Sequence, residues 1–129
     1  LAYDAWREML LDESYFASEA YDSLFSKLLV QNDATQCLAD GRSKGAQYLL
    51  ELAAEGKEGH EKLEKAARHF QKVSAHAEEM GRLLGDWSDM DAMLKRLADR
   101  KVREKLAERI LVAKAQDEAA LSCLKEYLQ

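Results

Sequence analysis

The chain has 129 residues, a net charge of −5 and no proline. Apolar residues make up 47% of it and charged residues 33%, which suits a folded domain and excludes a disordered chain. The negative charge argues against nucleic-acid binding, and apolar runs as short as residues 48–50 cannot cross a membrane. Because proline interrupts helices, its absence favours long uninterrupted ones.

A short amphipathic helix is expected over residues 3–12, since Tyr3, Trp6 and Leu10 recur at spacings of three and four. The stretch from there to Ser18 is typical of a connector. Serine is a common N-cap, so Ser18 is the expected start of the next helix.

Two long helices follow. The first is expected over about residues 19–54, because its apolar period continues in phase through Gly41 and Gly45. A kink at Gly41 is one reading, and close approach of a neighbouring helix at Gly45 is the favoured one. Two glycines within residues 55–59 predict a turn. The second long helix is expected over residues 60–84.

The last third of the chain predicts a short helix and a long one. Ser88 and Asp91 resemble a capping box at the start of the short helix, which carries Met90 and Leu97 and continues or breaks near Asp99. The long helix then runs to about residue 127. Short loops between long helices imply antiparallel neighbours. We therefore expect a single all-α domain over residues 1–129: an antiparallel up-and-down bundle of three long helices, with two short ones covering its ends or a fourth side.

No arrangement of residues predicts catalysis or metal binding. A di-iron bundle needs a glutamate three residues before a histidine, and none of the three histidines has one. His69 and His76 are about 10 Å apart along one helix, too far to share a metal. Cys37 lies nearly opposite the apolar stripe of its helix, with no histidine placed to activate it. We expect no cofactor, and two thiols without a metal or redox motif favour a cytoplasmic protein.

Two surface features are candidates for recognition. Residues 95–109 are rich in lysine and arginine, whereas the charged residues among 1–22 are mostly acidic. The favoured interpretation is a solvated face that complements the acidic end of this or a neighbouring chain, and the alternative is a docking face for an acidic partner through Arg100 and Arg103. Trp87 lies in a polar loop, where it either caps the bundle end, which we favour, or is exposed for recognition.

The most informative feature is a pair of opposite charges inside apolar stripes. Arg42 lies at the centre of the stripe on its helix, and Asp117 does the same on the last helix. Counting residues from the turns places both at one level, together with Ser74. Unpaired charges are costly in a core, so we predict a buried ion pair between Arg42 and Asp117. Ser74 is available to add a hydrogen bond, and Asn32 and Thr35 to extend the polar seam.

Three explanations of this layer remain open. The pair fixes the register of the helices, or it lines a cavity for a small polar ligand, or the helix phase is misjudged and both charges lie at the rim. The first is favoured.

Part of the sequence resembles a known family. The run from Cys37 to Arg42, the residues around Trp6 and those around Asp117 are similar to the helical C-terminal segment of bacterial proteins related to the butirosin-biosynthesis acyltransferase. In that family a helical region follows a papain-like cysteine domain. The resemblance implies that Arg42 and Asp117 belong to a recurring polar core, and that any nucleophile lies in a domain outside this sequence. A first residue other than methionine agrees with a piece of a longer protein.

The function expected from the sequence is a non-catalytic helical accessory module that binds a small polar ligand or a protein partner, or that oligomerises. The alternative is the accessory half of an acyltransferase- or peptidase-like enzyme, with substrate contacts from the Arg42 layer.

Overall fold

The computed structural model describes residues 3–16 and 21–129 of the chain, and within these residues every regular element is a helix. Three helices are long: α3 (Tyr21–Ala53), α4 (His60–Leu84) and α6 (Arg100–Leu128). Three are short: α1 (Tyr3–Leu11), α2 (Glu13–Phe16) and α5 (Met90–Ala98). The predicted all-α bundle is confirmed. None of the described helices is both long enough and apolar enough to span a membrane.

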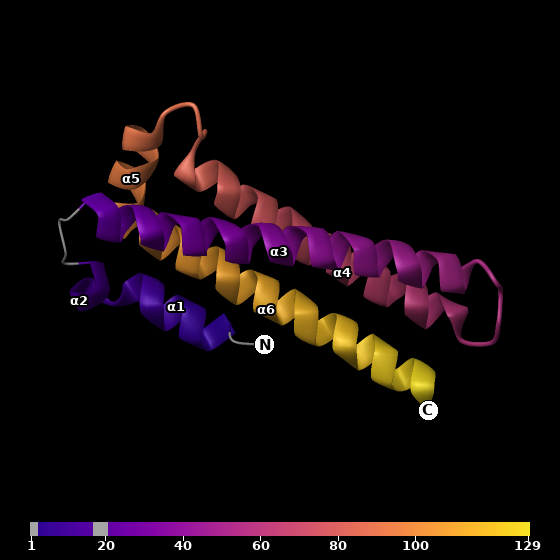
Figure 1. The fold of residues 1–129 in the computed structure, drawn as a ribbon. Helices are drawn as coiled ribbons and strands as arrows, with labels where there is room; N and C mark the ends of the chain where they lie inside the picture. Colours follow the sequence, from indigo (N-terminus) through magenta and orange to yellow (C-terminus); the bar gives the residue numbers. More distant parts are fainter. Residues whose placement is uncertain (1–2, 17–20) are drawn as a thin grey trace.

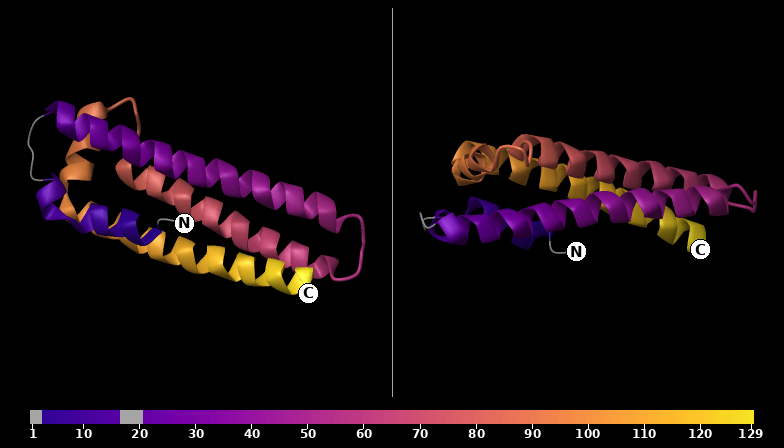
Figure 2. Two further views of the ribbon diagram at one scale, coloured as in Figure 1. Left: turned by 60° about the horizontal axis from the view of Figure 1, so that its bottom comes forward. Right: turned by 45° about the horizontal axis from the view of Figure 1, so that its top comes forward.

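The long helices form the body of the bundle. α4 packs closely against both α3 and α6 and runs antiparallel to them, so that α3 and α6 point the same way (Figures 1 and 2). α1 lies beside the first half of α6, on the fourth side of the bundle. α5 crosses the end at which α3 begins. α5 thus covers one end of the bundle, and α1 covers the fourth side over only half the length of the bundle.

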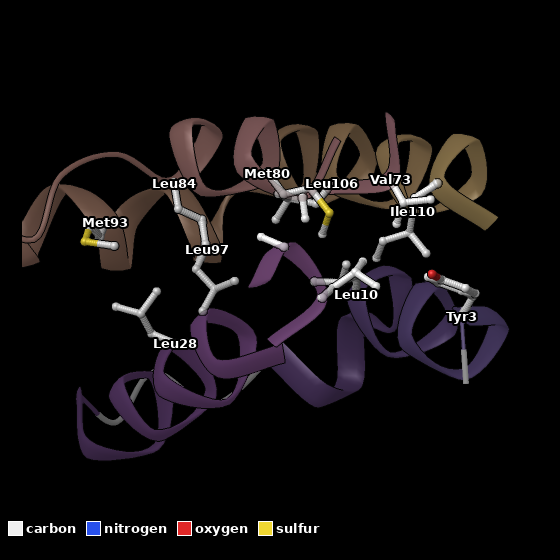
Figure 3. Close-up of a cluster of buried hydrophobic side chains, with 14 of the residues drawn as sticks. Tyr3, Leu10, Leu28, Val73, Met80, Leu84, Met93, Leu97, Leu106 and Ile110 are labelled. Carbon is white, nitrogen blue, oxygen red and sulfur yellow. The ribbon is translucent and has the colours of Figure 1, made fainter. Parts of the chain in front are cut away.

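The buried apolar residues form two separate clusters. The first core draws on α1, α3, α4, α5 and α6 and holds most of the large side chains, including Leu28, Met80 and Leu106 (Figure 3). Tyr3 lies at one end of this cluster beside Ile110. The second core lies in the other half of the bundle, and five of its seven buried members are alanine: Ala46, Ala53, Ala66, Ala67 and Ala120.

The observed helix ends correct two expectations and decide a third that was left open. The connector after residue 12 contains α2, which Asp12 caps by accepting hydrogen bonds from Ser14 N at 2.9 Å and Ser14 Oγ at 2.6 Å. The N-cap of α5 is Asp89 rather than Ser88, because its Oδ1 accepts from Ala92 N at 3.1 Å. The helix is interrupted at Asp99, between α5 and α6, and the Asp99 side chain caps α6 by accepting a hydrogen bond from Lys101 N. The expected cap at Ser18 lies outside the described residues.

Glycines play different parts at different positions. A Cβ at Gly45 would lie 4.0 Å from Phe70, an ordinary contact, so the close helix approach expected at Gly45 is not present. A Cβ at Gly41 would meet no atom within 4 Å, although this residue lies inside α3. Gly85, in contrast, has a φ of 102° just after α4, a region in which only glycine is unstrained, and a Cβ there would overlap the Arg96 guanidinium.

Two glycine substitutions should therefore act in opposite directions. Gly41→Ala should raise the free energy of unfolding by about 0.5–1 kcal/mol, because alanine loses less backbone entropy inside a helix and finds open space here. Gly85→Ala should lower the free energy of unfolding, because alanine is strained at this positive φ and its Cβ would overlap Arg96. Equilibrium denaturation with urea measures both changes, and a loss of stability in Gly41→Ala would contradict the account.

Candidate functional site

The predicted ion pair between Arg42 and Asp117 is present. Arg42 Nε donates to Asp117 Oδ1 at 2.7 Å, and Arg42 Nη2 donates to Asp117 Oδ2 at 2.8 Å. This bidentate geometry is the strong form of an arginine–carboxylate contact. The Asp117 side chain is only 5% exposed and that of Arg42 is 23% exposed. The pair is therefore partly open to solvent on its arginine side.

Tyr3 is a third member of this layer, although the sequence pattern predicted it only as part of the apolar face of a short amphipathic helix. Its hydroxyl donates to Asp117 Oδ2 at 3.1 Å. Burial, together with the neighbouring Asp117 carboxylate, raises the pKa of Tyr3 to about 12, against the lowering effect of Arg42. A buried tyrosine generally needs a partner for its hydroxyl, which is the signal that could have identified it. One carboxylate thus joins α1, α3 and α6.

Ser74 lies near this layer but does not bond to the pair. Its hydroxyl donates to the Ala39 carbonyl at 2.9 Å and so joins α4 to α3 one turn before Arg42. Phe70, one turn earlier on α4, has its ring 5.7 Å from the Arg42 guanidinium carbon. The layer separates the first core from the second, since Phe70 packs against the second core and Ala39 belongs to the first.

The predicted polar seam is present at Thr35, but its buried amide is one residue away from the expected one. Thr35 is buried as expected, and its hydroxyl donates to the Gln31 carbonyl at 2.8 Å. Gln31 rather than Asn32 is the buried amide, at 1% exposure, and its Oε1 accepts from Trp6 Nε1 at 2.7 Å. Asn32 is half-buried. One residue turns a helix by about 100°, so the position of α1 decides which of the two amides is covered.

Two arginines within residues 95–109 bind groups of the chain itself. Arg103, expected on a solvated face, is 1% exposed. It donates to the Leu10 carbonyl at 2.9 Å and to Glu13 at 3.1 Å. Arg100 bonds to Glu13 at 2.8 Å and to Glu104 at 2.9 Å. The acidic partner of this stretch is thus α2, which corrects the placement of Arg103 on an exposed docking face.

Trp87 is 43% exposed in the loop between α4 and α5, so the favoured expectation that it is packed down as a cap does not match its position.

His69 and His76 lie apart, as expected: His69 contacts Gln116 at 2.7 Å, and His76 contacts Arg109 at 3.4 Å. No three metal-binding side chains of the described residues come together as a metal site would require.

Beside the ion pair the surface is hollowed. A pocket of about 240 Å³ is lined by Tyr3, Lys114, Asp117, Glu118 and Leu121. Lys114 closes one side, since its Nζ binds Asp4 of α1 at 3.0 Å. The pocket therefore lies at the start of α1, where α1 stops covering α6.

The uncovered part carries apolar side chains that point to solvent. Leu121 is 48% exposed, Leu128 is 82% exposed and Leu124 is half-buried. On α3, Tyr48 is 61% exposed and Leu52 is half-buried. Residues about 18 positions apart on a helix, which is five turns, point in the same direction. Tyr48 and Leu52 therefore face the same side as Val30 and Ala34, which line a cleft against α1. We call the surface formed by Tyr48, Leu52, Leu121, Leu124 and Leu128 the open face.

No family model, no curated protein and no solved structure matches this chain. The resemblance to the helical segment of butirosin acyltransferase-like proteins therefore stays a prediction, and no residue role is taken from it.

Removing the carboxylate should destabilise the fold. Asp117→Ala leaves the Arg42 guanidinium and the Tyr3 hydroxyl without their acceptor, and we expect the free energy of unfolding to fall by about 3 kcal/mol. Glu108→Ala is the matched control, because Glu108 is an exposed carboxylate on the same helix and its loss should be nearly neutral. Chemical denaturation measures both, and a neutral Asp117→Ala would contradict the role of the pair.

The Tyr3 hydroxyl should make stability fall in alkali. An ordinary tyrosine has a pKa of 10.0, whereas burial raises that of Tyr3 to about 12, so the unfolded chain releases this proton at lower pH than the folded chain. The contribution is complete below pH 10 and is lost as the pH rises from about 10 towards 12. Unfolding free energies measured against pH should fall more steeply in this window for the wild type than for Tyr3→Phe, and equal slopes would refute the buried phenol.

Proposed function

We propose that this chain is a protein-interaction module that accepts an amphipathic helix on its open face. The observation that carries the proposal is the incomplete fourth side of the bundle. α1 occupies that side only as far as Lys114 and Asp117. Beyond them α3 and α6 continue to Ala53 and Leu128, about three helical turns or 16 Å, and no described helix covers them.

α1 indicates what kind of segment fits this side. It packs with Tyr3 and Leu10 buried on its inner face, while Asp4 on its rim binds Lys114 of α6. An amphipathic helix therefore already docks on the same two helices in the first half of the molecule. A second helix placed in line with α1 would meet the same types of side chain, with Leu121 and Leu124 on one wall and Leu52 and Tyr48 on the other.

The second core gives a reason for such a partner. Its many alanines let three helices pack closely, but they bury little apolar area per residue. Leu52 and Leu124 pack against this core while remaining partly open to solvent. A docked helix would complete their burial. Contiguous apolar surface of this kind marks interaction sites in folded proteins.

A small polar ligand is less well supported. The pocket beside the pair is lined by Asp117, but that carboxylate already accepts three hydrogen bonds, two from Arg42 and one from Tyr3. The contacts instead favour a structural role for the pair, which sets the level at which α1 begins. Both cysteines are free, which supports the cytoplasmic setting proposed from the sequence.

Selection of helical peptides tests the proposal. A display library of amphipathic helices about 20 residues long is selected against the immobilised full chain, and the affinity of each selected peptide is measured by calorimetry. Leu121→Asp should weaken binding at least about tenfold. The matched control is Leu111→Asp, because Leu111 is the same residue type on the same helix and is 47% exposed against 48% for Leu121. Peptides that bind Leu121→Asp as well as wild type would refute the open face.

A further inference from the structure

We infer that the helix docked on the open face is α6 of a second copy of this chain, paired antiparallel with α6 of the first about a twofold axis near Leu121 and Ser122. The inference rests on the proposed function and names its partner. Three features of α6 carry it: an apolar seam, the exposure of that seam and a charge pattern that complements itself.

The apolar seam has the spacing of a paired helix. Leu121, Leu124 and Leu128 follow one another at intervals of three and four residues, which is the pattern of residues that meet a neighbouring helix in a coiled coil. Leu121 and Leu128 are 48% and 82% exposed. The seam therefore continues past the point where α1 stops covering α6.

The charges beside the seam are placed symmetrically. Glu118 and Lys125 are seven residues apart and lie on the same side of α6, next to Leu121. The midpoint between them falls between Leu121 and Ser122. A twofold axis through that midpoint brings Glu118 of each copy opposite Lys125 of the other, which makes two ion pairs from one symmetric contact.

The same charges favour the antiparallel orientation. In a parallel pair, residues on the same flank of the two copies of α6 lie on opposite sides of the seam, so Glu118 would not reach Lys125 of the other copy and both ion pairs would be lost. Both side chains are open to solvent: Glu118 is 66% exposed and forms an ion pair with Lys114 of its own helix at 4.0 Å, and Lys125 is exposed.

The antiparallel arrangement also fits the rest of the molecule. α1 runs antiparallel to α6 (Figure 1), and so would the α6 of a second copy. The two segments would lie in line on the fourth side of the bundle, with Lys114 near their junction. The same axis places Lys114 opposite Gln129, an uncharged residue, so the arrangement creates no like-charge contact at that position.

Charge reversal tests both the partner and the register. Sedimentation equilibrium on the full chain should show a dimer, and Leu121→Asp should make it a monomer. Glu118→Lys and Lys125→Glu should each raise the dimer dissociation constant at least about tenfold. The double variant, Glu118→Lys with Lys125→Glu, should return it close to the wild-type value. Leu111→Asp should remain a dimer, and circular dichroism checks that every variant is folded.

Two results would overturn the inference: a wild-type chain that remains monomeric throughout the micromolar range, or a double variant that dimerises no better than the single ones. The proposed function fails separately. If the chain is monomeric and yet binds selected helices in a manner that depends on Leu121, the open face takes a foreign helix and only the second copy is excluded.

Discussion

The carboxylate of Asp117 is the interaction on which the arrangement of this bundle depends. α3 and α6 each pack on α4 and approach each other less closely, so few other contacts fix their relative height. Asp117 accepts from Arg42 on α3 at 2.7 and 2.8 Å and from Tyr3 on α1 at 3.1 Å. Sliding either helix by one turn, about 5.4 Å, would leave a buried charge without its donors, a costly state. The layer thus sets the register and also the place where α1 begins.

A second electrostatic constraint operates at the end of the bundle covered by α5. The C-terminal ends of α1, α4 and α5 meet there, and each presents carbonyl groups without helical partners. Arg96 donates to the Leu84 carbonyl, while Arg103 donates to the carbonyls of Leu10 and Ala98. Cations are favourable at such helix ends. Two arginines of the basic stretch, Arg96 and Arg103, thus neutralise helix ends.

The helical period and the lengths of the turns were enough to predict the long helices and the contact between Arg42 and Asp117, because both depend only on position along regular helices. They could not predict what α1 and α2 cover. Arg103 has the sequence context of a solvated residue and is buried only because α2 docks over it, with Phe16 4.2 Å from its guanidinium carbon. Gln31 and Asn32 are equally polar neighbours, and the contact with Trp6 alone distinguishes them. These features arise from docking, which leaves no period in the sequence.

The division of the core by a polar layer has a consequence for how the molecule opens. Free energies of local opening follow the apolar area that each region buries. The first core contains leucine, methionine and isoleucine from five helices, whereas the second is mostly alanine from three. Amide hydrogens beyond Arg42 and Asp117 should therefore exchange with solvent through openings that leave the first core folded. The far half of the bundle should therefore open as a cooperative unit of its own, and a helix docked there would also complete its folding.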